Sequence, residues 1–136
     1  MEKKEELNNE ELYKEKVLDH YHNPRNRGHL ENPDFTTGHF NPSCGDSIGF
    51  DAYAQDGKIK EIMFTGDGCA VSQAAASMLT EYAVGKTLDE LLKLDKDFML
   101  KLVEMPLGPM RIRCALLSLQ ALHKGINDYN GKKGNG

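Results

Sequence analysis

The sequence predicts an α+β domain in which a small three-stranded antiparallel sheet carries helices on one face. Between Phe35 and Gly66, apolar and polar residues alternate with the period of a strand. The segment "QDGK" interrupts this alternation and is typical of a hairpin turn. After "GDG" the apolar residues recur at offsets of three and four, which is helical spacing. Strands grouped first and helices grouped later indicate the α+β class.

A helix is also predicted ahead of the sheet, over residues 9–22. Its apolar residues fall on one side: Leu12, Tyr13, Val17 and Tyr21. "NPRNRG" ends this helix, because the residue before a proline disfavours helical backbone and Gly28 allows a turn.

For two strands the sequence assigns each residue to a side of the strand, and a third strand is expected shortly before Cys44. In "SIGFDAYA" one side of the strand consists of Ile48, Phe50 and Ala52. In "IKEIMFTG" the alternation places Ile59, Glu61 and Met63 on one side of the strand. Lys60, Ile62 and Phe64 lie on the other side.

Further helices follow the sheet. The first has an apolar face that consists of Val71, Ala75, Met78, Leu79 and Tyr82. Gly85 ends it, and Thr87 and Asp95 are capping residues for two shorter helices. The last helix is predicted from about residue 110 to 127.

Length and composition favour a single domain over residues 1–136, with residues 1–8 and 129–136 expected to be frayed. The net charge of -4 disfavours nonspecific nucleic-acid binding. No apolar run is long enough to span a membrane, and the charged start does not resemble a secretory signal. Three cysteines cannot all pair within one chain, so we expect reduced thiols in a cytoplasmic protein.

Each cysteine lies at a predicted element boundary. Cys44 precedes a strand, Cys69 precedes a helix directly after Gly68, and Cys114 opens the last helix. There is no CxxC pair, so a local zinc knuckle is excluded. One such cysteine is commonly a small buried hydrophobe, but three at boundaries of rigid elements indicate a shared site.

Asp46 can supply a fourth ligand to such a site. Residues i and i+2 of an extended segment point the same way, and Gly45 lets the backbone approach closely. Three thiolates and one carboxylate suit tetrahedral zinc or an iron–sulfur cluster. The hard carboxylate oxygen should hold a soft site less firmly than a fourth sulfur would. His39 is the one histidine that competes with Asp46 for this position.

The thiolate form is favoured at a helix N-terminus and beside basic residues. This reasoning applies to Cys69 and to Cys114, which is flanked by Arg111 and Arg113.

Four motifs, in this order, resemble the iron–sulfur cluster assembly scaffold family, of IscU/SufU type and similar to the NifU N-terminal domain. They are "DHYHNPRNRG", "NPSCGD", "GDGCAVSQAAASMLTE" and "RIRCALLSLQAL", within residues 12–125. The resemblance implies a scaffold rather than an enzyme, with Cys44, Cys69 and Cys114 as metal ligands and sulfur acceptors and Asp46 as the fourth ligand. The implied cargo is a transient 2Fe–2S cluster built from iron, with zinc as another occupant of the same site.

The implied partners are a cysteine desulfurase, which supplies sulfur, and acceptor or carrier proteins, which receive the cluster. A homodimer around a shared cluster is left open. The family's "LPPVK" segment for an Hsp70-type chaperone is absent, so dependence on that chaperone is not expected. Neither nucleic acid nor a membrane is an expected partner.

Two features leave an alternative function open. Arg113 stands where IscU-type members usually carry a histidine, and arginine does not ligate metals. The alternative is therefore a zinc-binding sulfurtransferase of the SufU branch, although that branch usually has about twenty further residues between its second and third cysteines. A cysteine-nucleophile enzyme that uses Cys114 and a structural zinc module are the other hypotheses.

Overall fold

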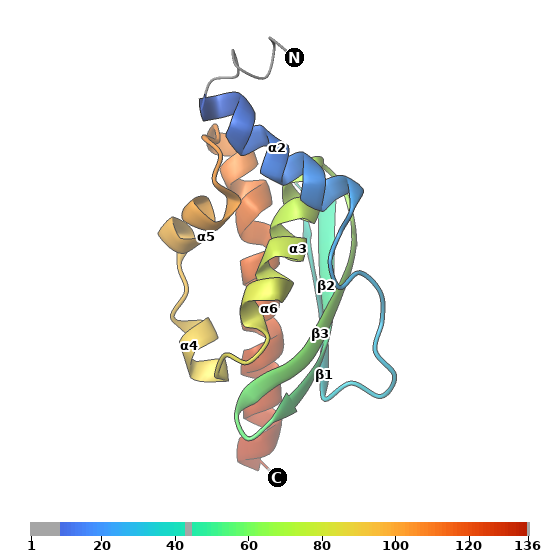
Figure 1. The fold of residues 1–136 in the computed structure, drawn as a ribbon. Coiled ribbons are helices and arrows are strands. Elements are labelled where there is room, and N and C mark those ends of the chain that lie inside the picture. Colours follow the sequence, from blue (N-terminus) through green and yellow to red (C-terminus); the bar gives the residue numbers. More distant parts are fainter. Residues whose placement is uncertain (1–8, 43–44, 136) are drawn as a thin grey trace.

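Three strands form one antiparallel sheet in chain order, and the helices stack against one of its faces (Figure 1). The structure, a computed structural model, describes residues 9–42 and 45–135. The strands are β1 (Phe35–Asn41), β2 (Asp46–Gln55) and β3 (Lys58–Asp67), paired as β1–β2–β3. The predicted α+β class and the predicted three-stranded sheet are confirmed.

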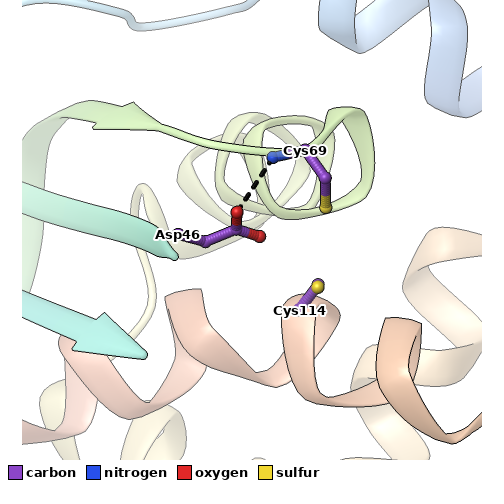
Figure 2. Close-up of side chains that lie close together, drawn as sticks. All are labelled: Asp46, Cys69 and Cys114. Atoms are coloured by element: carbon purple, nitrogen blue, oxygen red, sulfur yellow. Dashed lines mark hydrogen bonds between the residues drawn. The ribbon is translucent and has the colours of Figure 1, made fainter. Parts of the chain in front are cut away.

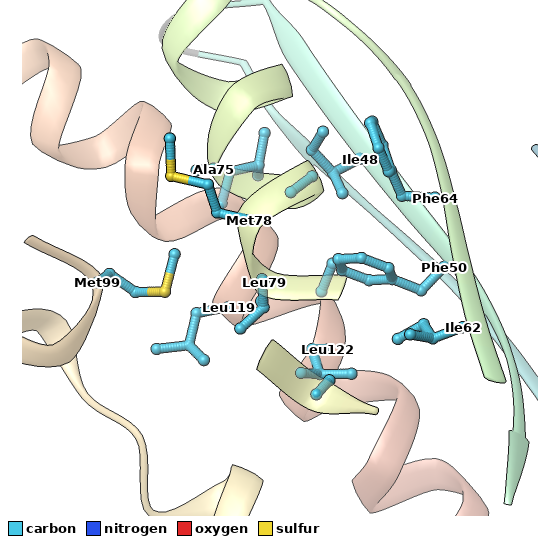
Figure 3. Close-up of a cluster of buried hydrophobic side chains, with 14 of the residues drawn as sticks. Ile48, Phe50, Ile62, Phe64, Ala75, Met78, Leu79, Met99, Leu119 and Leu122 are labelled. Carbon is cyan, nitrogen blue, oxygen red and sulfur yellow. The ribbon is translucent and has the colours of Figure 1, made fainter. Parts of the chain in front are cut away.

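The β2–β3 hairpin turns at Asp56 and Gly57, which both have positive φ, as the "QDGK" signal predicts. The alternation predicted for β2 is also confirmed, because Ile48, Phe50 and Ala52 are all buried. The side chains of Ile48 and Phe50 point toward the helices (Figure 3), and all three residues belong to the hydrophobic core.

The alternation predicted for β3 is wrong at Ile59. Ile59 is buried on the same side as Ile62 and Phe64, and not opposite them. The register explains this, because Tyr53 pairs with Glu61 while Ala54 pairs with Ile59, leaving Lys60 as an extra residue. Such a β-bulge reverses the side-chain parity within the strand and so brings both isoleucines into the core.

Helix α3 (Ala70–Ala83) lies at the centre of the helical layer and contacts α2, α5, α6 and the sheet. Its predicted apolar face is confirmed, but burial extends around the helix to polar residues as well. These are Ser72, Gln73, Ser77 and Thr80. Short helices α4 (Leu88–Leu92) and α5 (Lys96–Val103) follow, and Thr87 and Asp95 cap them as predicted.

Helix α2 (Asn9–His22) has the predicted bounds but buries a different residue near its end. Val17 is buried as predicted, whereas Tyr21 is 40% exposed and His20 is buried instead. The His20 Nδ1 atom lies 2.8 Å from the Ser77 hydroxyl of α3, which gives the ring a polar partner inside the interface. Leu12 and Tyr13 lie outside the described side chains.

Helix α6 (Pro109–Asn135) is longer than the predicted segment that ended near residue 127. Tyr129 packs its ring against Phe35, with centroids 5.8 Å apart, so helical packing on β1 continues past the predicted end. The helix therefore includes residues 129–135, which the sequence predicts to be frayed, while residues 1–8 and 136 lie outside the described chain. No helix in the described chain is both long and apolar enough to cross a lipid bilayer.

The segment between α2 and β1 runs from the free edge of β3 across to β1. Gly28 and Phe64 are joined by a backbone hydrogen bond, and Arg27 forms a parallel bridge with Phe64. Farther along, His29 and Leu30 both contact the carboxyl group of Asp51 on β2. This segment thus covers one end of the face that the helices leave open.

We predict that Gly125→Ala destabilises the protein because α6 approaches β1 too closely for a side chain. A Cβ atom at Gly125 would lie 2.9 Å from the Phe35 ring and 2.9 Å from Thr37 Cγ2. Such overpacking typically costs about 1–3 kcal/mol, which outweighs the better helix propensity of alanine. Thermal unfolding should show a lower Tm than wild type.

Gly131→Ala is the matched control for this substitution, because no atom lies within 4 Å of its added Cβ in the same helix. It should leave the free energy of unfolding unchanged or raise it by up to about 1 kcal/mol. Equal Tm shifts for the two variants would contradict the close approach of α6 to β1.

We predict that Asp51 makes stability depend on pH in the acid range. Burial raises the pKa of its carboxyl, but the Thr36 hydroxyl, His29 and the Leu30 N–H outweigh burial and hold that pKa below its ordinary value of 3.8. The stabilisation is therefore present above about pH 4 and is lost as the pH falls through the lower, folded-state pKa.

Urea unfolding of Asp51→Asn should accordingly show a loss of about 1–3 kcal/mol at neutral pH that shrinks toward zero in acid. The exposed Asp128→Asn serves as the control for removing one negative charge. A loss for Asp51→Asn that stays constant across the pH range would argue against an ionised, hydrogen-bonded Asp51.

Candidate metal centre

Three potential metal ligands from distant parts of the chain converge at one end of the sheet. Asp46 is the first residue of β2, Cys69 immediately precedes α3, and Cys114 lies on α6. One carboxylate oxygen and the two Sγ atoms all lie within 4.8 Å of one another. Figure 2 shows the carboxylate and the two thiols facing a common space between the strand ends and the helices. The predicted convergence of these three residues is therefore present in the structure.

The fourth predicted residue, Cys44, lies outside the described residues, so its place in this group stays a prediction. Its neighbour Gly45 has a φ of 73° and donates its N–H to the Asn41 carbonyl at 2.8 Å. Asn41 in turn pairs with Asp46, so the β1–β2 turn closes directly beside the group. His39, the predicted rival of Asp46, lies opposite Ile48 on β1 and is not one of the three grouped donors.

The two oxygens of Asp46 have different surroundings although the side chain is only 2% exposed. Oδ1 accepts a hydrogen bond of 3.1 Å from the backbone N–H of Cys69. Oδ2 is buried and has no hydrogen-bond partner among the described residues. A buried carboxylate oxygen without a partner is costly, and a bound cation is one of the groups that satisfy it.

Asp46 is ionised despite its burial. Burial raises the pKa of its carboxyl, but the thiol and N–H of Cys69, followed by Cys114 and Ser72, outweigh this and hold the pKa below its ordinary value of 3.8. These donors act on the carboxyl as a whole, while Oδ2 itself has none within hydrogen-bonding distance. The group is therefore a carboxylate at neutral pH, the form that ligates metals.

Glycine is required at position 68 by the position of this carboxylate. Gly68 has a φ of 133°, which side-chain-bearing residues rarely adopt. A Cβ atom there would lie 2.1 Å from Asp46 Oδ1 and 2.4 Å from its Cγ. Without a side chain, the turn after β3 can pass directly over Asp46 and deliver the Cys69 N–H to it.

The two described cysteines differ in exposure and in position along their helices. Cys69 is exposed, occupies the N-cap position of α3 and makes no side-chain cap hydrogen bond. Cys114 is only 3% exposed. Because α6 begins at Pro109, Cys114 lies in the second turn and does not open the helix as predicted. The helix dipole falls off within the first turn, so Cys114 lies beyond its reach.

The two arginines beside Cys114 are both exposed. Arg111 lines a small pocket together with Cys69, whereas Arg113 is not part of that lining. Of the two arginines predicted to support the site, the structure therefore places Arg111 beside Cys69.

The sequence reasoning missed two buried polar residues beneath the thiols. The Ser72 hydroxyl donates to the Cys69 carbonyl at 3.0 Å, and the Gln73 amide donates to the Ser72 hydroxyl at 3.3 Å. Gln73 Oε1 has no partner among the described residues. The sequence did contain a sign of these residues, because Ser72 and Gln73 are the two polar residues in an otherwise apolar, alanine-rich stretch after Cys69. Ser72 and Gln73 thus form a buried polar layer next to Cys69.

Two thiols and a carboxylate whose second oxygen has no partner form a donor set that suits a thiophilic metal. Thiolate sulfurs favour zinc and the iron of iron–sulfur clusters, and a tetrahedral site needs only one further donor. The arrangement fits such a metal at Cys69, Cys114 and Asp46 Oδ2.

Comparisons with known proteins show which family and which relatives the chain is similar to. A family model described as the NifU-like N terminal domain matches residues 12–135. The chain is 38% identical over 123 residues to "Iron-sulfur cluster assembly scaffold protein IscU 1" of Archaeoglobus fulgidus, covering 90% of this chain and 80% of that protein. It is 36% identical over 137 aligned residues to "Zinc-dependent sulfurtransferase SufU" of Bacillus subtilis, covering 88% of this chain and 92% of that protein.

The fold has also been seen in a solved structure. The N-terminal part of a nitrogen-fixing NifU-like protein from Brucella abortus superposes with a TM-score of 0.73 at 22% sequence identity. The superposition covers 90% of this chain and 97% of that one.

We predict that Gly68→Ala weakens metal binding by displacing the Asp46 carboxylate. Because the added Cβ would overlap Oδ1, the carboxylate must move away from Cys69. Loss of an orienting contact typically lowers metal affinity by about 10–100-fold. Titration with Co²⁺, followed by its thiolate charge-transfer absorption, measures this affinity.

Gly85→Ala is the matched control. Gly85 also has a positive φ, of 84°, but no atom lies within 4 Å of its added Cβ. It should lose about 1–2 kcal/mol of stability while keeping its Co²⁺ affinity. If both variants bind Co²⁺ as wild type does, the carboxylate is not a ligand.

Proposed function

Because this chain belongs to the NifU-like N-terminal domain family, we propose that it is a scaffold for iron–sulfur cluster assembly that holds a labile 2Fe–2S cluster. Iron and sulfur derived from a cysteine desulfurase are the substrates, and acceptor proteins receive the finished cluster. The family resemblance supplies this class of cargo, and the donor set at the end of the sheet supports it.

The observation that carries the proposal is the unpartnered Oδ2 atom of Asp46 beside two thiols. The fold holds a buried, ionised carboxylate by one oxygen and leaves the other directed at the sulfur atoms (Figure 2). A purely structural aspartate would be expected to have both oxygens paired. A metal ion between the carboxylate and the thiolates satisfies Oδ2 and neutralises the negative charge.

In this proposal Cys69, Cys114 and Asp46 ligate the metal, and Cys44 is the expected fourth ligand. A carboxylate binds thiophilic iron less firmly than a fourth thiolate does, so cluster release is easier than from a four-cysteine site. Asp46 also keeps its hydrogen bond to Cys69 while Oδ2 engages the metal. The thiols must be reduced to ligate, which is consistent with a cytoplasmic protein.

A second candidate function is that of a zinc-dependent sulfur acceptor. Arg113 beside Cys114 and the similarity to the Bacillus subtilis sulfurtransferase favour it. However, the alignment with that protein spans 137 positions, more than this chain contains, so this chain lacks residues that the sulfurtransferase has. The alignment with the Archaeoglobus fulgidus scaffold spans 123 positions over 90% of this chain and needs almost no gaps. The scaffold function is therefore the better supported of the two.

The test is anaerobic reconstitution with iron, sulfide and reductant. Wild-type protein should develop visible sulfur-to-iron charge-transfer absorption and bind iron and sulfide in equal amounts. Cys114→Ser should lose most of this absorption, because it replaces one proposed sulfur ligand, which is buried, with a hard oxygen. Mixing the reconstituted protein with an apo-ferredoxin then measures cluster transfer.

Met99→Leu is a suitable control, because it changes a buried core residue that is not one of the grouped donors and conserves volume. It should reconstitute as wild type does. A wild-type protein that stays colourless, while binding one zinc ion tightly and accepting sulfur, would reject the scaffold function in favour of the sulfur acceptor.

A further inference from the structure

The two outer edges of the sheet differ in how the rest of the chain covers them. The segment after α2 lies along the outer edge of β3. There Gly28 donates its N–H to the Phe64 carbonyl, and Phe64 donates its own N–H to the Asn26 carbonyl, each at 2.9 Å. The outer edge of β1 has no such cover, because no strand or bridge within residues 9–42 and 45–135 pairs with it. The backbone groups along β1 therefore have no strand partner on that side.

Alternate residues of β1 direct their backbone groups out of this edge. A Cβ atom at Gly49 of β2 would lie 2.9 Å from the Thr37 carbonyl oxygen, so that oxygen points toward β2. Successive residues of a strand direct their N–H and C=O groups to opposite edges. Gly38 accordingly directs its carbonyl outward, where the Lys124 ammonium group of α6 donates to it at 3.4 Å.

The sequence of β1 lacks the features that commonly protect a strand edge from pairing. Such edges are protected by proline, by charged side chains, by bulges or by short length. β1 is seven residues long, contains no proline, lysine, arginine, aspartate or glutamate, and pairs with β2 in unbroken register. Thr36, Gly38 and Phe40 thus each present an N–H and a C=O group along one regular edge.

A groove lies between the start of β1 and the last turns of α6. Its volume is about 480 Å³, and its lining includes Phe35 and Thr36 of β1 and Asp128, Tyr129 and Lys132 of α6. An exposed strand edge is a place where an extended peptide can add as a further strand. Backbone hydrogen bonds then hold the peptide, and alternate side chains enter neighbouring pockets. The groove provides such a pocket beside the edge.

The charges along the edge indicate which peptide fits. Lys124 is exposed and lies at the middle of the edge, on the Gly38 carbonyl. A pairing N–H would take over that carbonyl and leave the ammonium group free to bind a carboxylate of the peptide. In the groove, Asp34 and Asp128 outnumber Lys132, so a second acidic residue is disfavoured there.

The same lysine argues against a second copy of this chain as the occupant. Two β1 strands paired antiparallel about Gly38 would bring two Lys124 ammonium groups together, and like charges at a contact are destabilising. β1 also carries no carboxylate that could neutralise them. The edge therefore fits a different chain with an acidic side chain better than it fits itself.

We propose that the outer edge of β1 binds an extended acidic segment of a partner protein, which adds to the sheet as a fourth strand and places one carboxylate beside Lys124. Backbone pairing with residues 36–40 supplies the affinity, and Lys124 supplies the preference for an acidic residue. The inference goes beyond the proposed function, since the edge uses none of the grouped metal ligands.

The test adds a fluorescein-labelled peptide of alternating valine and threonine, with one central glutamate, to the full chain. Fluorescence anisotropy measures binding, and amide hydrogen exchange followed by NMR locates it. The amides of Gly38 and Phe40 should become protected, while those of Thr37 and His39, which face β2, should not change. The same peptide with N-methylated backbone amides should not bind, because it has no N–H groups to donate.

Gly38→Pro and Gly38→Ala are a matched pair of variants. A Cβ atom at Gly38 has no neighbour closer than the Ile48 carbonyl oxygen at 3.9 Å, so both side chains have room. Gly38→Pro removes the outward N–H, which an edge strand tolerates, and should weaken peptide binding about tenfold. Gly38→Ala keeps the N–H and should bind as wild type does. Circular dichroism checks that both variants fold.

Lys124→Glu should weaken binding of the glutamate peptide about tenfold and strengthen binding of the same peptide with lysine in place of glutamate. Lys96→Glu is the control for reversing one charge, because Lys96 is exposed on α5. It should stay within about twofold of wild type for both peptides.

The inference is overturned if the glutamate peptide does not bind, if binding survives N-methylation, or if Gly38→Pro and Gly38→Ala bind equally. Protection of Gly38 and Phe40 that grows with protein concentration without any peptide would also overturn it, and would assign the edge to a second copy of the chain. Cluster reconstitution of Gly38→Pro should match wild type. A wild-type protein that fails to reconstitute rejects the proposed function and leaves peptide binding at the edge unaffected.

Discussion

The hydrogen bond from the Cys69 N–H to Asp46 Oδ1 is the contact on which the candidate site depends. It joins the first residue of β2 to the residue that begins α3, and it holds a carboxylate that is otherwise buried. Gly68 makes the contact possible, because any side chain there would overlap the carboxylate. With Oδ1 fixed in this way, Oδ2 faces the thiols without a partner of its own. The ligand side chains that the sheet, the start of α3 and α6 carry are thereby brought together.

In the proposed function, this arrangement holds the ligands in rigid positions but binds the cluster weakly. The sheet and the central helix α3 fix two of the ligands, and Cys114 is fixed by the buried face of α6. In the proposed function the carboxylate of Asp46 is the one hard donor among thiolates, and it lowers the affinity of the site for thiophilic iron without loosening the fold. A scaffold needs both properties, since it must position iron and sulfur during assembly and release the cluster afterwards. The two described thiols also differ in accessibility, because Cys69 is exposed and Cys114 is buried.

Features that depend on neighbouring residues in the sequence were predicted well. The bounds of α2, the Asp56–Gly57 turn and the caps at Thr87 and Asp95 all follow from local conformational preferences. Features that depend on packing between distant elements were not predicted. The bulge at Lys60, the burial of His20 in place of Tyr21 and the extension of α6 by Tyr129 each require a partner from a distant element.

The same distinction applies to the site. The cysteines at element boundaries indicated a shared site, and the family resemblance implied that Asp46, Cys69 and Cys114 meet there. The sequence could not show that Arg111 and not Arg113 shares a pocket with Cys69. The polar layer of Ser72 and Gln73 was also missed, because buried serine and glutamine in a helix are visible only once the helix is packed.

The most direct test of the central claim is to measure iron, zinc and acid-labile sulfide in protein purified without oxygen, together with its oligomeric state. The account predicts iron and sulfide in equal amounts, lost together when the protein meets an acceptor. Stoichiometric zinc with no sulfide, retained in the presence of iron and a sulfur donor, would contradict it.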